Sequence, residues 1–130
     1  MTGSVGIVLV SHSAELASGL AELLAQIGSA SVPIVAAGGT DDGRIGTSYD
    51  RVAKAIQAAD QGAGVVVLPD LGSSVLTART VLDDRPQADV TIVDAPFVEG
   101  AVAAAVIAAA GGDLSAVVSA AKEARDVPKL

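Results

Sequence analysis

The stretch "GIVLVSHSAEL" (residues 6–16) decides how this chain folds. Together with the preceding valine, its first half forms a continuous apolar run, Val5 to Val10, which is typical of a strand buried on both faces of a parallel sheet. The run leads into Ser11, His12 and Ser13, after which leucines recur at helical spacing. His12 is the only histidine in the chain. The stretch therefore predicts a buried strand that ends at a histidine and turns directly into a helix.

Strand-like and helix-like segments alternate along the rest of the chain. Short apolar runs predict four strands, at residues 5–10, 32–37, 65–68 and 90–93. The spacing of apolar residues and the usual start and stop residues predict five helices, at 13–27, 48–59, from about 73 to a loop at 83–89, 96–110 and 113–124. Each predicted strand is thus followed by a helix.

Repeated strand–helix units imply a parallel sheet with right-handed crossovers. With four strands, the economical arrangement is a doubly wound, three-layer α/β fold, in which a central four-stranded parallel sheet of order 2-1-3-4 carries helices on both faces. The first and third strands are then neighbours, and their following helices lie on opposite faces. The loops after these two strands meet at the carboxyl edge of the sheet, where folds of this class bind ligands.

The composition excludes several classes of function. The chain has no cysteine, which rules out disulfides and thiol chemistry and suits a reducing, cytoplasmic compartment. A net charge of −7 and only two aromatic residues, one Tyr and one Phe, argue against nucleic-acid binding. The apolar stretch 101–112 is shorter than the roughly 20 residues of a membrane span and predicts a buried helix. No phosphate-binding loop, dinucleotide motif or metal-ligand cluster is present, so we expect no metal and no cofactor.

The predicted strand order brings His12 and Asp70 face to face. An aspartate that accepts a hydrogen bond from one imidazole nitrogen fixes the tautomer and leaves the other nitrogen as a nucleophile. This pair is therefore the candidate catalytic site, with His12 carrying a phosphoryl group and Asp70 orienting the ring. A plainer alternative is that His12 is a polar residue at a strand end and that Asp70 belongs to the cap of the next helix.

Two predicted helix starts surround this pair. Gly72, Ser73 and Ser74 stand at one of them and Ser13 at the other. Because helix N-termini present free N–H groups and a positive dipole end, these residues are candidate ligands of a phosphoryl group. The alternative is purely structural: Ser11 and Ser13 cap the first helix, and Gly72 makes a tight turn.

Four short motifs occur in order along most of the chain: "VSHS" (10–13), "GG…DGRIGTS" (38–48), "DLGSS" (70–74) and "DAPFVEGA" (94–101). Together they resemble the mannose-type enzyme IIA domain of the phosphoenolpyruvate-dependent sugar phosphotransferase system. More closely, the set is similar to the phosphoryl-donor subunits of phosphoenolpyruvate-dependent dihydroxyacetone kinases. The resemblance implies that residues 1–130 form a single domain of this type.

The resemblance also implies roles for particular residues. His12 matches the histidine that is phosphorylated by the phosphocarrier HPr and then passes the phosphoryl group onward. Asp70 matches the aspartate that hydrogen-bonds this imidazole. Four more positions match motif residues that line the same cleft: Gly39, Thr40, Gly72 and Ser73. In such a family the acceptor is ADP held in the nucleotide-binding subunit of the kinase, the final substrate is dihydroxyacetone, and related domains form homodimers.

Two other functions stay open on the sequence alone. One is a mannose-type enzyme IIA that serves a sugar permease, although the segment 94–101 favours the dihydroxyacetone branch. The other is a non-catalytic, flavodoxin-like module in which the cleft holds an anion reversibly. Incubation with phosphoenolpyruvate, enzyme I and HPr separates the binding module from a carrier, because only a carrier gains an acid-labile phosphate. A transfer assay with each acceptor separates the sugar branch from the dihydroxyacetone branch.

Overall fold

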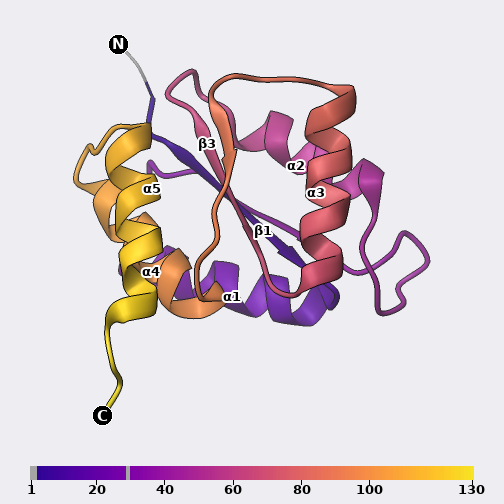
Figure 1. The fold of residues 1–130 in the computed structure, drawn as a ribbon, viewed down its shortest axis with the longest axis horizontal. Coiled ribbons are helices and arrows are strands. Elements are labelled where there is room, and N and C mark those ends of the chain that lie inside the picture. Colours follow the sequence, from indigo (N-terminus) through magenta and orange to yellow (C-terminus); the bar gives the residue numbers. More distant parts are fainter. Residues whose placement is uncertain (1–2, 29) are drawn as a thin grey trace.

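The structure, a computed structural model, describes residues 3–28 and 30–130. Within these residues, four strands form one parallel sheet: β1 (Gly6–Ser11), β2 (Ile34–Gly38), β3 (Val65–Pro69) and β4 (Val90–Ile92). Their order is β2-β1-β3-β4, which confirms the predicted topology (Figure 1). In the register of the sheet, Ile7 of the central strand β1 lies opposite Ile34 and Val66. β1 and β3 are therefore neighbours, as the strand order requires.

In the part of the chain that the structure describes, five helices and a short 3-10 turn follow the strands: α1 (Ala14–Ile27), α2 (Tyr49–Ala59), α3 (Gly72–Asp84), α4 (Phe97–Ala109), α5 (Leu114–Glu123) and η1 (Ala124–Asp126). The predicted first residues Ser13, Ser48 and Asp113 are N-caps, because each side chain accepts a hydrogen bond from the backbone N–H three residues further on. β2 begins two residues later than predicted, after Pro33, which has no N–H to donate. α3 extends to Asp84, into the segment predicted as a loop.

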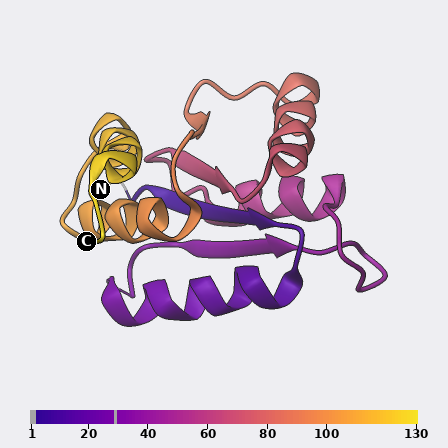
Figure 2. The same ribbon diagram turned by 60° about the horizontal axis from the view of Figure 1, so that its bottom comes forward.

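The helices form two layers that enclose the sheet. α1, α4 and α5 pack on one face, and α2 and α3 pack on the other. Figure 2 shows α1 below the strands and α2 and α3 above them. The buried apolar residues on both faces are Ala, Val, Leu and Ile. The helices that follow β1 and β3 therefore lie on opposite faces, as predicted.

Two apolar helices are buried on one side only. Leu20 and Leu24 of α1 face the core, whereas the other leucines and Ile27 at helical spacing are each more than 40% exposed. The stretch 101–112, expected to be a buried helix, likewise has one buried side and leaves Val106 46% exposed; its buried alanines are Ala101, Ala104, Ala105 and Ala108. Across residues 3–28 and 30–130, no helix has the length and apolar character needed to span a membrane.

Two glycines let the layers approach the sheet closely. A methyl group at Gly6 of β1 would lie 2.1 Å from the carbonyl oxygen of Ala59, the last residue of α2. At Gly38, the last residue of β2, it would lie 2.5 Å from the carbonyl oxygen of Ser13. Both neighbours are backbone atoms, which cannot turn aside as a side chain can. The second contact brings the start of α1 against the end of β2, at the edge of the sheet that carries His12.

Candidate functional site

The carboxyl ends of β1 and β3 bring His12 and Asp70 together. His12 follows the last residue of β1, and Asp70 follows the last residue of β3 and donates its N–H to the carbonyl oxygen of Val10 at 3.0 Å. Nδ1 of His12 lies 2.9 Å from Oδ1 of Asp70. The side chains are 19% and 9% exposed, respectively. The two residues that the sequence predicted to face each other are therefore in hydrogen-bond contact.

The carboxylate of Asp70 accepts five hydrogen bonds. Its Oδ1 accepts from the ring Nδ1 of His12, from the N–H of Leu71 at 2.7 Å and from the hydroxyl of Ser74 at 2.9 Å. Its Oδ2 accepts from the hydroxyl of Ser11 at 2.9 Å and from the backbone N–H of His12 at 3.1 Å. These five bonds fix the orientation of the carboxylate.

Hydrogen bonding determines the charge of Asp70 and the tautomer of His12. Burial raises the pKa of the Asp70 carboxyl, but the hydrogen bonds from His12, Ser11 and Ser74 together outweigh it, so this pKa lies below its usual value. An ionised carboxylate can only accept, and Nδ1 therefore carries the ring proton. In the neutral ring Nε2 keeps the lone pair, to which the hydroxyl of Ser73 donates. This arrangement leaves Nε2 as the ring nitrogen that can act as a nucleophile.

Two helix N-termini begin beside the imidazole. α1 starts two residues after His12, and α3 starts at Gly72. Within the described part of the chain, the backbone N–H groups of Gly72 and Ser73 have no hydrogen-bond partner, whereas that of Ser74 donates to the carbonyl oxygen of Leu71 at 3.0 Å. Two free N–H groups at a helix start suit a phosphoryl group.

The glycine-rich segment 39–46 packs against the backbone of His12. Gly39, which has a positive φ of 73°, donates its N–H to the carbonyl oxygen of Ser11 at 3.1 Å. Gly46, with a φ of 145°, donates its N–H to the carbonyl oxygen of His12 at 2.9 Å. Because residues other than glycine rarely adopt such φ values, glycine is favoured at both positions. The segment therefore supports the loop that carries His12.

Threonine side chains hold this segment together and join it to α3. The hydroxyl of Thr40 accepts from the N–H of Arg44 at 3.0 Å, so it is engaged inside the loop. The hydroxyls of Thr47 and Thr77 lie 2.6 Å apart and link the end of the loop to α3. Thr40 was predicted as a ligand of the phosphoryl group. Its observed bonds give it a place in the loop, and the ligand role stays a prediction.

The other predicted ligands occupy different depths of the site. Gly72 and Ser73 are both exposed, and the hydroxyl of Ser73 contacts Nε2 of the ring. Ser13 uses its hydroxyl to cap α1, accepting from the N–H of Leu16 at 3.2 Å. Ser74 is fully buried behind Asp70. The bond from Ser11 to Asp70 was missed by sequence reasoning, although a serine ending a buried strand was the available signal.

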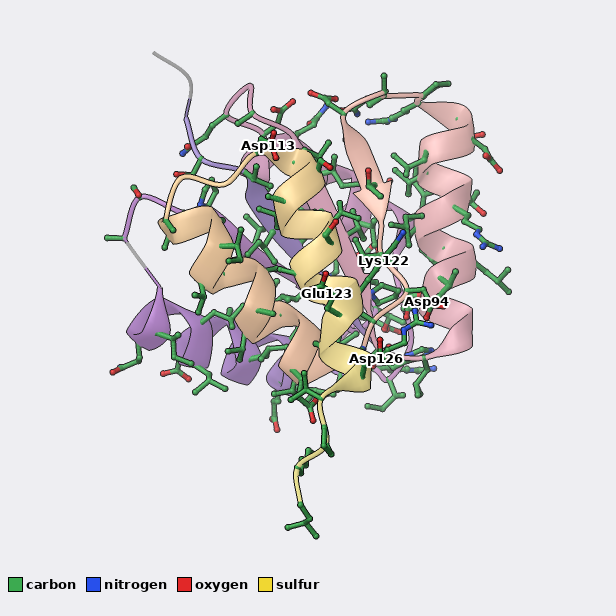
Figure 3. All side chains as sticks on the ribbon, turned by 60° about the vertical axis from the view of Figure 1, so that its left-hand side comes forward. Asp94, Asp113, Lys122, Glu123 and Asp126 are labelled. Carbon is green, nitrogen blue, oxygen red and sulfur yellow. The ribbon has the colours of Figure 1, made fainter. Side chains whose placement is uncertain are left out.

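The segment 94–101 reaches the site at its first residues. Asp94 and Ala95 border a groove of about 450 Å³ that Asp70 and Gly72 also line. Asp94 pairs with Arg125 at 3.1 Å, and Figure 3 shows it facing the charged side chains near the end of α5. The motif thus joins the carboxyl edge of the sheet to the C-terminal helix.

A second groove lies away from His12. It has a volume of about 560 Å³ and is lined mainly by apolar side chains of α4, α5 and the residues after η1, such as Val102, Val106 and Val127. The described residues contain no group of three or more side chains suited to hold a metal ion. The residues that line this second groove include neither His12 nor Asp70.

The family model described as "PTS system fructose IIA component" (EIIA-man) matches residues 6–118. Among solved structures, the crystal structure of the protein EF1359, of unknown function, matches with a TM-score of 0.84 and 34% identity. This match covers 92% of the present chain and 94% of that one. The chain belongs to the EIIA-man family of phosphotransferase-system components.

Similar proteins show where the chain belongs within this family. The chain is 40% identical over 105 residues to the phosphoryl donor subunit DhaM of PEP-dependent dihydroxyacetone kinase 2 from Listeria innocua, covering 78% of this chain and 84% of that protein. It is 37% identical to the phosphotransferase subunit DhaM of Lactococcus lactis, covering 86% and 89%. It is 40% identical to DhaM of Escherichia coli, covering 88% of this chain but 25% of that longer protein. Within the EIIA-man family, the chain groups with the DhaM phosphoryl-donor subunits.

Proposed function

We propose that this chain is a phosphohistidine carrier: Nε2 of His12 takes a phosphoryl group from HPr and passes it to ADP in the nucleotide-binding subunit of a dihydroxyacetone kinase. The observation that carries the proposal is the 2.9 Å contact between Nδ1 of His12 and Oδ1 of Asp70. The names of the DhaM relatives support a phosphoryl-donor role toward dihydroxyacetone kinase. HPr as donor and ADP as acceptor are the finer parts of the proposal.

In the loading step, the lone pair of Nε2 attacks the phosphorus atom of the phosphorylated donor. The new N–P bond forms as the bond from phosphorus to the donor's nitrogen breaks, and the electron pair of that bond stays on the donor. His12 keeps its proton on Nδ1, so the ring becomes positive. Asp70 stabilises this charge through the hydrogen bond that it already accepts.

The start of α3 binds the transferred group. The free N–H groups of Gly72 and Ser73 point from a helix N-terminus, where negative charge is favoured. The hydroxyl of Ser73, which donates to Nε2 in the unphosphorylated protein, turns to a phosphoryl oxygen. These donors are in place before the reaction and stabilise the charge that develops in the transition state.

In the unloading step, an oxygen of the terminal phosphate of ADP attacks the same phosphorus. The N–P bond breaks and its electron pair returns to Nε2. The proton on Nδ1 makes the imidazole a better leaving group, because the ring departs neutral. The proton therefore remains on Nδ1 throughout the cycle, and Asp70 keeps it there.

The test is phosphorylation of the full chain by phosphoenolpyruvate, enzyme I and HPr. We expect the wild-type chain to gain one acid-labile, base-stable phosphate, and we expect His12→Gln to gain none. Thr80→Ala is the matched control, because this exposed hydroxyl on α3 donates, among the described residues, only to the carbonyl oxygen of Leu76. Labelling of a folded His12→Gln chain would overturn the proposal.

The same assay separates the competing functions. Transfer from the phosphorylated chain to ADP in a dihydroxyacetone kinase subunit supports the proposed acceptor. Transfer to a sugar-permease component instead would assign the chain to the sugar branch, which the family description also allows. A chain that is never phosphorylated but binds phosphate reversibly would be the flavodoxin-like module.

We further propose that residues 1–130 work as one domain, in the cytoplasm and as a homodimer. Support comes from the resemblance and from one sheet shared by both core layers. Sedimentation of the purified chain measures the oligomeric state, and a monomer at micromolar concentration would contradict the dimer.

A further inference from the structure

Two buried hydroxyl groups bond to the carboxylate that orients His12. Ser11 and Ser74 are both fully buried, and they are the buried polar residues of the described chain. Ser11 donates to Oδ2 of Asp70 and Ser74 to Oδ1, each at 2.9 Å. They come from different elements, β1 and α3, and reach the carboxylate from its two oxygens. The pair therefore holds Asp70 from both sides.

Neither hydroxyl is placed to touch a phosphoryl group. Both side chains are buried and bonded to Asp70, which contacts Nδ1 of His12. Nε2 is the other nitrogen of the ring, and it contacts the exposed Ser73. A buried hydroxyl is unfavourable unless it is hydrogen-bonded, and here the charged carboxylate supplies the bond. Ser11 also accepts from the N–H of Ser13, and Ser74 shares its proton with the carbonyl oxygen of Leu71. The two serines consequently act on the reaction only through Asp70.

Each donated hydrogen bond disperses the negative charge of the carboxylate. A carboxylate that accepts several such bonds is a weaker base, because its ionised form is stabilised. It therefore draws the Nδ1 proton of His12 less strongly and stabilises a positive ring less. This matters most after His12 is phosphorylated, because a ring with a phosphoryl group on Nε2 and a proton on Nδ1 carries positive charge.

We propose that Ser11 and Ser74 are positioning residues that limit how strongly Asp70 stabilises phosphorylated His12, so that the phosphoryl group stays transferable. The inference rests on the proposed carrier function. With the hydroxyls present, the phosphorylated and free forms remain close enough in free energy for transfer in both directions. Without them, Asp70 becomes more basic and the chain retains its phosphoryl group.

The variants Ser11→Ala and Ser74→Ala test this. Each removes one donor and leaves Asp70 with four, among them the bond to Nδ1 of His12. We expect the equilibrium with phosphorylated HPr to shift toward the phosphorylated chain by about three- to tenfold per variant. We expect onward transfer to slow by a similar factor. Thr80→Ala, which removes an exposed hydroxyl of α3, should change neither value.

Nuclear magnetic resonance of the unphosphorylated full chain provides a second measurement that needs no phosphoryl transfer. The carboxyl carbon resonance of Asp70 should titrate at higher pH in both serine variants than in the wild type. The ¹⁵N shifts of His12 should still show the proton on Nδ1. A change of Asp70 titration without a shift of the phosphorylation equilibrium would overturn the inference, and so would unaltered titration in folded variants.

These two measurements separate the possible failures. A wild-type chain that HPr does not phosphorylate would refute the proposed function, whereas the titration of Asp70 would still report on the serines. Should Ser74→Ala unfold, Ser11→Ala acts on the other oxygen and tests the same effect. A phosphorylation equilibrium shifted toward HPr in either folded variant would contradict the inference.

Discussion

At the scale of single residues, the carboxylate of Asp70 connects several parts of the site. Asp70 is hydrogen-bonded to the ring of His12, to the backbone N–H of His12 after β1, and to the N–H of Leu71 just before α3. The same carboxylate thus bonds to the end of β1, to the start of α3 and to the imidazole of His12. A substitution at Asp70 should consequently affect both the reaction and the stability of the fold.

The variant Asp70→Asn separates charge from shape. The amide has nearly the same shape as the carboxylate, but its NH₂ group cannot accept, so donors on one side lose their partner. We expect phosphoryl transfer to His12 to slow by roughly 100-fold or more, because control of the tautomer is lost. Single-turnover transfer from phosphorylated HPr measures this rate. An unaltered rate in the folded variant would remove Asp70 from the mechanism.

The pH dependence of stability should also report Asp70. Its pKa is lowered in the folded chain, so its stabilising contribution is present above the unfolded value of about 3.9 and is lost as the pH falls through the folded pKa. The difference in free energy of unfolding between the wild type and Asp70→Asn should therefore be constant near neutral pH and shrink below about pH 3.9. Urea unfolding at several pH values measures it.

The comparison with Asp70→Asn is needed because other carboxyls titrate in the same range. Hydrogen bonds from Ser48 and from Lys129 lower the pKa values of Asp41 and Glu99, respectively. Asp41 and Glu99 are present in both the wild type and Asp70→Asn, so their contributions to the free energy of unfolding cancel in the difference. A difference that does not change between neutral pH and pH 3 would contradict the assignment to Asp70.

At the scale of elements, the first turn of α3 is the proposed binding site of the phosphoryl group. Gly72 is the first residue of the helix, and a methyl group there would meet no atom within 4 Å. Its N–H has no partner in the described chain. The preceding Leu71 is extended, with φ −127° and ψ 169°, a conformation that a following proline favours. Gly72 is therefore a position where one N–H can be deleted cleanly.

The variant Gly72→Pro tests that N–H. Proline is favoured at the first helical position, so we expect the fold to be retained. If the N–H binds the developing charge, transfer should slow by about 100-fold, the usual effect of losing one such donor. Gly72→Ala keeps the N–H and should retain much more activity than Gly72→Pro. Equal rates for the two variants would exclude the N–H from the mechanism.

At the scale of the whole molecule, the topology of the sheet could be predicted from the sequence. Buried strands alternated with helices, and the handedness of crossovers restricted the strand order. That order alone placed His12 beside Asp70, 58 positions apart in the chain. The start of α1 was also predictable, because Ser13 is a typical N-cap residue.

Details that depend on tertiary contacts could not be predicted from the sequence. The sequence does not show whether a serine caps a helix or bonds to a distant carboxylate, and only the fold directs Ser11 and Ser74 to Asp70. Nor does helical spacing tell how wide a buried face is, so Leu16 and Leu23 of α1 fit the pattern yet stay exposed. The spacing identified the helix, and the packing of α1 on the sheet selected the buried residues.

Close packing of the layers leads to a matched pair of glycine substitutions. Gly6→Ala would force a methyl group against the backbone of Ala59, and relief requires α2 to move away from β1. We expect this variant to lose about 2 kcal/mol or more of stability. Gly19 lies exposed in the middle of α1 with no atom within 4 Å of the added methyl group, so Gly19→Ala should gain about 0.5–1 kcal/mol. Urea unfolding at neutral pH measures both. A Gly6→Ala variant as stable as the wild type would mean that α2 does not rest on β1 as closely as the backbone contact at Gly6 requires.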